Sequence, residues 1–276
     1  MARSSRHEFA SGEYCCLARD SEENAMNQKD KATQFAGLHV TGEPLLLYNV
    51  WDAGSAATLA NAGARAIATS SWSVAEAQGY RDGEDIPVDF FNRIIARIVA
   101  SVELPISADF EGGYTEDDDQ LAENISGLLD VGIIGINFED RIVNGSGLYS
   151  IDRQADRIAV IRRAGEQKGI PLFINARTDL FLGQGNDPKA VTEEAVDRAK
   201  AYAAAGASGF FIPGLQEKPL IARIIDGAPL PVNVMVMDGV PHNSELAEIG
   251  VARISYGNAP YVDVLRALEQ DFVKLH

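Results

Sequence analysis

The sequence predicts a single-domain (β/α)8 barrel of the TIM type. Eight short, β-rich apolar runs follow one another between residues 45 and 256, and stretches with helical periodicity separate them. Most of these runs are apolar almost throughout, which is typical of parallel strands buried on both faces. Eight strand–helix units in 276 residues match the size of such a barrel. An open, doubly wound sheet is the alternative, but the turn after the first run has neither a G-x-G-x-x-G nor a P-loop pattern.

The predicted elements follow one another in chain order from residue 42 onward. Asp52 stands directly after the first run, where an N-cap would open the first helix. The stretch 152–165 repeats apolar residues at the spacing of one helical face and leaves its charged residues on the other. The stretch 193–205 has the same pattern, with Gly206 as the predicted C-cap. The predicted strands are 45–50, 64–69, 105–110, 132–139, 171–176, 208–213, 231–237 and 251–256.

Composition and charge exclude several classes of protein. The net charge of −16, from 40 acidic and 24 basic residues, argues against binding nucleic acid by neutralising phosphates. No apolar run approaches the ~18 residues that span a bilayer, so we expect no membrane partner. Cys15 and Cys16 are adjacent and are the only cysteines, so no disulfide framework is expected. The first residues lack the apolar segment of a signal peptide, and the cytoplasm is therefore the expected location.

The chain divides into two predicted parts. Residues 1–33 are polar and aperiodic, which predicts a poorly ordered N-terminal tail, and Met26 is an alternative start of the protein. Residues 34–276 form the predicted barrel domain, without an internal linker or a low-complexity segment.

Polar residues gather where the predicted strands end. Active sites of barrel enzymes lie at the C-terminal ends of the strands, so these residues are candidates for chemistry. They are Asn49, Asp52, Ser70, Ser71, Trp72, Asp109, Glu111, Glu139, Asp140, Asn175, Arg177, Asp179 and Asn233.

Asp109, Glu111 and Glu139 form the most informative group. The first two are two residues apart at a strand end and therefore point the same way, and the third follows the adjacent strand. Three carboxylates so close would raise one another's pKa values unless a cation offsets their charge. An all-oxygen group suits Mg2+ or Mn2+, with some of the acids binding through water. The alternative is structural: Glu111 starts a turn with the two glycines that follow it, and Glu139 or Asp140 pairs with Arg141.

Arg177 is the candidate for holding an anionic substrate. A guanidinium at the mouth of a barrel can bind a carboxylate in bidentate fashion, and the alternative is an ion pair with Asp179 or with an acid of the metal site. Asn233 is a weaker substrate-binding candidate, because an amide on a strand can simply satisfy a neighbouring loop. None of the four histidines falls at a strand end, which argues against a Ser-His-Asp triad.

Five strings of residues resemble the isocitrate lyase/phosphoenolpyruvate mutase superfamily. The order and spacing of the strings match, and the resemblance runs from about residue 35 to the C-terminus. The strings are T-S-S-W-S-V-A at 69–75, Y-R-D at 80–82, A-D-F-E-G-G-Y at 108–114, N-F-E-D at 137–140 and N-A-R-T-D at 175–179.

The resemblance implies a barrel that binds Mg2+ and a small 2-oxo carboxylate or its enolate. It also implies a homotetramer, a dimer of dimers in which the last helix is swapped between partner barrels. By position, Asp109 corresponds to the direct metal ligand, and Asp82, Glu111 and Glu139 to acids that hold the water ligands of the metal. Glu111 stands where most members have aspartate. Segment 70–72 (Ser70, Ser71, Trp72) corresponds to the part that binds the substrate carboxylate, and Arg177 to the arginine that steadies the enolate.

Three departures from the family pattern bear on the substrate. Lyases of the family carry a K-K/R-C-G-H loop after the fourth strand, whereas residues 141–150 here contain no cysteine, lysine or histidine. Ala68 stands where the lyases have tyrosine and phosphoenolpyruvate mutase has tryptophan. Within the loop, Asn144 could replace an asparagine of the mutase, and Ser146 or Tyr149 could close the site.

The sequence therefore predicts an Mg2+-dependent lyase. The expected reaction cleaves a C–C bond of a small 2-oxo or 2-hydroxy carboxylic acid through a metal-stabilised enolate, with Arg177 and Glu139 as catalytic residues. One alternative is P–C bond chemistry of the phosphoenolpyruvate or carboxyphosphonoenolpyruvate phosphonomutase type. The other is a non-catalytic 2-oxo acid binder.

Overall fold

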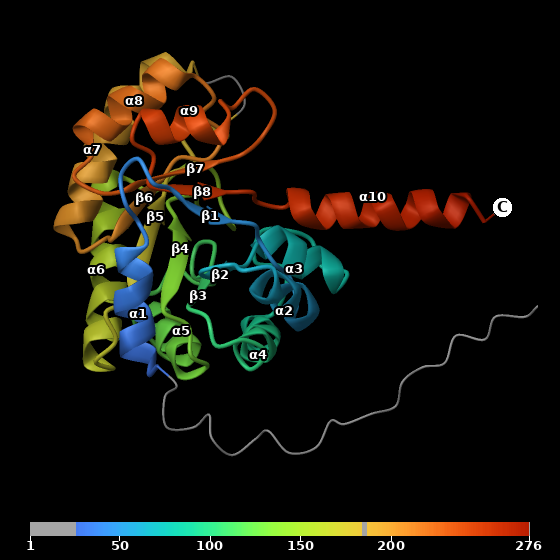
Figure 1. The fold of residues 1–276 in the computed structure, drawn as a ribbon. Helices are drawn as coiled ribbons and strands as arrows, with labels where there is room; N and C mark the ends of the chain where they lie inside the picture. The colour runs from blue at the N-terminus through green and yellow to red at the C-terminus, as the bar shows by residue number, and fades with distance from the viewer. Residues whose placement is uncertain (1–25, 184–186, 276) are drawn as a thin grey trace, which may run out of the picture.

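Eight parallel strands form one barrel in the computed structural model, which describes residues 26–183 and 187–275 (Figure 1). Neighbouring strands pair in the order β1-β8-β7-β6-β5-β4-β3-β2, and a parallel bridge between Val50 and Thr69 joins β1 to β2. The predicted single-domain (β/α)8 barrel is therefore confirmed, and each of the eight predicted runs matches one strand, with β5 ending one residue beyond its run. The strands are β1 Leu45–Leu47, β2 Ile67–Ala68, β3 Ile106–Asp109, β4 Gly135–Glu139, β5 Phe173–Arg177, β6 Gly209–Phe211, β7 Val232–Met235 and β8 Arg253–Ser255.

Helices alternate with the strands and cover the outside of the barrel (Figure 1). Asp52 is the N-cap predicted for the first helix after β1, and it forms a capping box with Ser55. Gly206 follows the C-cap residue Ala205 with a φ of +102°, a conformation that favours glycine. The helices are α1 Gln28–Gly37, α2 Ala53–Asn61, α3 Ser71–Ala77, α4 Val88–Val99, α5 Asp118–Asp130, α6 Ile151–Gln167, α7 Pro188–Ala204, α8 Lys218–Gly227, α9 Asn243–Glu248 and α10 Ala259–Val273.

Helix α1 begins inside the segment that the sequence assigned to a poorly ordered tail. Residues 28–33 are helical, so that prediction needs correction there, and residues 1–25 lie outside the described part of the chain. The Asn27 side chain caps the helix, and Ala32 and Phe35 are fully buried. The Phe35 ring packs edge-on against Phe173, at the start of β5, with 5.2 Å between ring centroids. Burying this aromatic residue under the barrel stabilises a helix too short to be stable alone.

Helix α10 points away from the barrel (Figure 1). Pro260 is its only buried residue among those described, and Leu268 is 67% exposed. On the barrel, Leu46 of β1 and Tyr48, directly after that strand, are also exposed. None of the described helices has the length and apolar character needed to cross a membrane.

Candidate active site

A cleft of about 160 Å3 opens at the C-terminal ends of the strands, where barrel enzymes carry their active sites. Seven of the predicted candidates, Asn49 among them, line it, whereas the predicted Glu111, Glu139 and Asn233 do not. The lining residues are Asn49, Ser70, Ser71, Trp72, Asp82, Asp109, Asn137, Arg177, Phe211, Met235, Ser255, Gly257 and Asn258.

Asp109 ends β3, and hydrogen bonds fix both of its carboxylate oxygens. Oδ2 accepts from the Ser71 backbone N–H at 3.1 Å and from the Ser71 hydroxyl at 2.8 Å. Oδ1 accepts from the Asn137 amide at 3.2 Å, and the pairing register of β3 with β4 places these two residues side by side. The Asn137 oxygen in turn accepts from Asn175 at 2.9 Å and from Arg253 at 3.1 Å, which sets the orientation of the amide. Asp109 is therefore held in one orientation at the floor of the cleft.

The start of helix α3 forms the β2 side of the cleft. Ser70 is the N-cap, and its hydroxyl accepts from the Ser73 N–H at 3.3 Å, so this hydroxyl is engaged in capping. Ser71 and Trp72 are the first residues of the helix, and their N–H groups belong to the helix end that has no internal acceptors. The Trp72 ring packs edge-on against Tyr261 with 6.0 Å between centroids.

Glu111 is buried in a strained turn directly after β3. Its φ is +48°, in the left-handed region that costs a non-glycine residue free energy. Its carboxylate accepts from the Glu84 N–H at 3.0 Å. Burial raises the pKa of Glu111 to about 9, and the nearby charges of Asp82, Glu139 and Asp109 add to the shift. The turn that the sequence left as a structural alternative is thus present, and it brings Glu111 next to the other acids.

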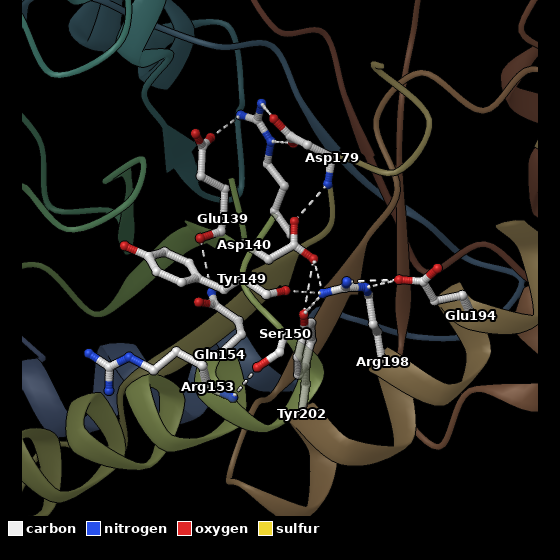
Figure 2. Close-up of polar contacts among 11 residues, drawn as sticks. Glu139, Asp140, Tyr149, Ser150, Arg153, Gln154, Asp179, Glu194, Arg198 and Tyr202 are labelled. Carbon is white, nitrogen blue, oxygen red and sulfur yellow. Dashed lines mark hydrogen bonds and ion pairs between the residues drawn. The ribbon is translucent and has the colours of Figure 1, made fainter. Parts of the chain in front are cut away.

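Arg177, Glu139 and Asp179 form a buried cluster beside the cleft (Figure 2). The guanidinium of Arg177 donates to Asp179 through Nε at 2.6 Å and Nη2 at 3.0 Å, and its Nη1 lies 3.0 Å from Glu139 Oε2. The structural alternative for Arg177 is therefore observed, and this residue still lines the cleft. Burial raises the pKa of Glu139, against the opposing effect of Arg177. A carboxyl with a raised pKa can exchange protons near neutral pH.

Asp140 connects this cluster to helix α7 through its own hydrogen bonds (Figure 2). Its carboxylate is fully buried and accepts from the Asp179 N–H at 3.0 Å, Arg198 Nη1 at 3.1 Å and the Tyr202 hydroxyl at 3.0 Å. Arg198 also donates to the Tyr149 carbonyl at 3.0 Å, at the end of loop 141–150. The sequence offered Arg141 as the partner of Asp140 and contained no signal for Arg198, which reaches it from α7. The network links the Arg177 cluster to the base of that loop.

The carboxylates of the site fit a divalent cation of the Mg2+ type. Asp82, at the mouth of the cleft, has its pKa raised by partial burial and by the charge of Asp109, as Glu111 does more strongly. The Arg177 charge is already shared by two acids, so a cation would relieve this repulsion. Within residues 26–183 and 187–275, no three His, Cys, Asp or Glu side chains are arranged as a complete metal site. A single directly ligating carboxylate would still suffice for Mg2+, which often takes one or two carboxylates directly and keeps several waters.

Asn233 is buried inside the barrel and does not line the cleft, although the sequence predicts that it binds the substrate. It is buried on β7, and its amide pairs with the Ser255 hydroxyl at 3.2 Å. Ser255 lines the cleft, so Asn233 reaches the site only through this residue. The sequence did not single out six of the lining residues as site residues: Asn137, Phe211, Met235, Ser255, Gly257 and Asn258. Asn137 stands in the N-F-E-D string, whereas the other five carry no motif, and the barrel brings all six together.

Comparisons with known proteins find similar sequences and a similar fold over most of the chain. Residues 35–276 match the family model described as phosphoenolpyruvate phosphomutase. An uncharacterised protein of Mycobacterium tuberculosis is 33% identical over 228 residues, which span 82% of this chain and 83% of that protein. An oxaloacetate decarboxylase of Pseudomonas savastanoi is 30% identical over 178 residues, which span 62% of this chain and 58% of the enzyme. A Burkholderia cenocepacia crystal structure, provisionally described as a phosphonomutase, is 42% identical with a TM-score of 0.87, and the match covers 91% of this chain and 100% of that one.

Replacing Glu111 by glutamine should change how stability depends on pH in metal-free protein. Because the folded-state pKa is about 9 and the ordinary value is 4.5, the folded state binds the proton more tightly. Its contribution to stability is complete below pH 4.5 and is lost as pH rises toward 9. We expect Glu111→Gln to unfold like the wild type at pH 5 and to be more stable by about 1 kcal/mol or more at pH 8. Urea unfolding at both pH values in EDTA measures this, and equal curves at pH 8 would contradict it.

Removing the Arg198 guanidinium should destabilise the fold far more than removing a surface arginine. Arg198→Gln leaves the Asp140 carboxylate buried without its cation, which we expect to cost about 3 kcal/mol. Arg223→Gln is the matched control, because the Arg223–Glu193 pair is solvent-exposed and should contribute under about 1 kcal/mol. Chemical denaturation of both variants provides the comparison, and similar losses would refute the anchoring role of Asp140.

Proposed function

Because this chain belongs to the phosphoenolpyruvate phosphomutase family, within the isocitrate lyase/phosphoenolpyruvate mutase superfamily, we propose that it is an Mg2+-dependent carbon–carbon lyase. Its substrate is a small 2-oxo or 2-hydroxy carboxylic acid. The observation that carries the proposal is the convergence, in one cleft, of the α3 N–H groups, the Asp109 carboxylate and the Arg177 guanidinium. The similarity to an oxaloacetate decarboxylase supports it.

Different groups of the site would bind the metal, bind the substrate carboxylate and stabilise the charge that develops during the reaction. Asp109 would hold the Mg2+ ion directly, and Asp82, Glu111 and Glu139 would hold its water ligands. When bound, Mg2+ supplies a Lewis acid that draws electron density from the bond being broken. The N–H group of Trp72 would bind the substrate carboxylate, and the N–H of Ser71 would join it only by giving up its hydrogen bond to Asp109. Asn233, on β7, supports the opposite side of the site through Ser255 of β8.

Arg177 and Glu139 are the proposed catalytic residues. The guanidinium lines the cleft and stabilises the negative charge that develops on the substrate's oxo oxygen as an enolate forms. The raised pKa of Glu139 suits it to exchange a proton near neutral pH. Glu139 Oε2 lies 3.0 Å from Arg177 Nη1. Protonating Glu139 would remove a negative charge from beside the guanidinium, which would then interact more strongly with the substrate.

Phosphonomutase chemistry is the second candidate, and the Burkholderia cenocepacia relative favours it. Moving a phosphoryl group requires cations around its oxygens. Arg177 already pairs with Glu139 and Asp179, and it is the only Lys or Arg among the described residues that line the cleft. This charge distribution supports the lyase over the mutase. Under the third alternative, a non-catalytic binder, the protein would bind oxalate with Mg2+ and turn over no substrate.

Asp109→Asn should abolish most of the activity. The variant retains the shape of the side chain but loses the negative charge proposed to hold Mg2+, and we expect turnover to fall by about 100-fold or more. The assay incubates purified protein with Mg2+ and oxaloacetate, substituted malates or phosphonopyruvate, and identifies products by mass spectrometry. Asp156→Asn, at an exposed position of α6, is the control and should behave as the wild type. Full activity of Asp109→Asn would show that the metal assignment is wrong.

We also propose that the chain assembles as a homotetramer, a dimer of dimers, through α10. The helix carries exposed apolar residues and points away from its own barrel (Figure 1). The barrel, in turn, presents an apolar groove of about 410 Å3 beside β1, lined by Leu46, Tyr48 and Leu59 among others. A partner's α10 covering such a face would remove both exposed apolar surfaces from water. The cytoplasmic location stays a prediction from the sequence.

A charge placed on α10 should reduce the size of the assembly. Leu268→Glu buries a carboxylate if the helix docks on a partner, so we expect the molar mass from light scattering to fall below that of the wild type. Glu269→Gln, which alters the charge of the neighbouring residue, should leave the mass unchanged. A wild type that is monomeric, or a Leu268→Glu variant with the mass of the wild type, would rule out this interface.

A further inference from the structure

We propose that the far end of the substrate, beyond the carbon that departs as a carbonyl in the C–C cleavage, is uncharged and apolar, and that Phe211 and Met235 select it. This inference rests on the proposed function, because it takes the carboxylate and metal end of the substrate as bound between β2 and β3. It adds the chemical class of the other end.

The topology of the barrel sets the direction in which that other end points. In the closed order of eight strands, β6 lies opposite β2 and β7 lies opposite β3. The carboxylate-binding segment at Ser71 follows β2, and Asp109 ends β3. A ligand held there extends across the cleft toward the ends of β6 and β7. Those ends carry Phe211 and Met235, and both line the cleft.

The wall formed by these two side chains is apolar and held in place. Phe211 is 4% exposed, whereas Met235 is partly open to the cleft. The Met235 sulfur lies 2.9 Å from where a Cβ at Gly257 would stand, so the missing side chain at residue 257 gives the thioether its space. Methionine adapts its shape to apolar ligands. The wall therefore accepts a small alkyl group at little cost.

A second carboxylate would have no cation to pair with on this side. The guanidinium of Arg177 donates to Asp179 through two nitrogens and pairs with Glu139 through the third. Among the described lining residues no other Lys or Arg is present. A carboxylate buried against Phe211 would lose hydration without an ion pair in return.

Two of the neutral polar groups that line the cleft, Asn49 and Ser255, are already engaged within the protein. The Asn49 amide donates to the Thr69 carbonyl at 2.8 Å, and its oxygen accepts from the Gly257 N–H at 3.0 Å. The Ser255 hydroxyl pairs with Asn233 at 3.2 Å. These groups have little remaining capacity to solvate an anion, which reinforces the preference for an alkyl group.

Two ligands of matched shape test the inference on the full chain in Mg2+. 4-Methyl-2-oxopentanoate and oxaloacetate carry an isopropyl group or a carboxylate at the same position, and oxalate represents the metal-binding end alone. Competition against oxalate, measured by the shift in melting temperature over a ligand titration, should show the isopropyl ligand binding at least about tenfold more tightly. Equal or tighter binding of oxaloacetate would overturn the inference while leaving the lyase proposal intact. Failure of oxalate to bind with Mg2+ would instead overturn the proposed function, and this inference with it.

A charge reversal inside the cleft provides the second arm of the experiment. Met235→Lys places a cation at the end of β7 and should shift the preference toward oxaloacetate by at least about tenfold. Met235→Leu should keep the apolar preference. Met237→Lys is the matched control, because Met237 is exposed and outside the lining, and it should leave the ratio of the two affinities unchanged. A ratio that moves as much in Met237→Lys as in Met235→Lys would contradict a local role for the wall. Stabilisation by oxalate and Mg2+ reports whether each variant is folded.

Discussion

The site depends on an excess of carboxylates held at one edge of a barrel. Asp109, Glu111 and Glu139 come from the ends of two neighbouring strands, and among the described residues that line the cleft Arg177 is the one Lys or Arg that offsets them. Bringing like charges together in a partly buried space costs free energy, and the raised pKa values are the expression of that cost. A protein maintains such an arrangement only where the fold holds the acids firmly, and a cation would then bind at a site prepared for it. The chemistry proposed for this chain follows from that imbalance.

Each acid has its own means of being held, and together they involve much of the barrel. Asp109 depends on an amide that Asn175 and Arg253 orient from two other strands. Glu111 depends on a left-handed turn, and Arg157 of α6 donates to the carbonyl of Gly112 in that turn. The Arg177 cluster depends on Asp140, which reaches α7 through Arg198 (Figure 2). Positioning is therefore distributed, and residues far from the cleft affect the charges within it.

The sequence was sufficient for the architecture but only partly for the site. Buried parallel strands appear as apolar runs, and family motifs at their ends locate Asp109 and Arg177, because both signals are local in the chain. Arg198 could not be found this way, since its partner lies 58 residues away and its own helix looks like an ordinary amphipathic surface helix. Helix α1 was missed for a similar reason: Phe35 is stabilised by the underside of a barrel that the local pattern does not represent. Contacts between distant segments, rather than propensity, decide these positions.

Residues 141–150 contain no cysteine, unlike the corresponding loop of the lyases that the sequence resembles, so another group has to transfer protons. We propose Glu139 for this role. The described residues that line the cleft include no histidine, cysteine, lysine or tyrosine, so its acidic groups are the carboxyls of Asp82 and Asp109, and Glu111 and Glu139 lie outside the lining. Asp109 is committed to its three hydrogen bonds, and Glu111 accepts from the backbone of Glu84. Glu139 instead faces Arg177, the group proposed to stabilise the developing charge, so a change in the protonation of Glu139 would alter the charge next to the substrate. One buried carboxyl–guanidinium pair could thus supply both electrostatic stabilisation and proton exchange, which a family member without the cysteine loop would require.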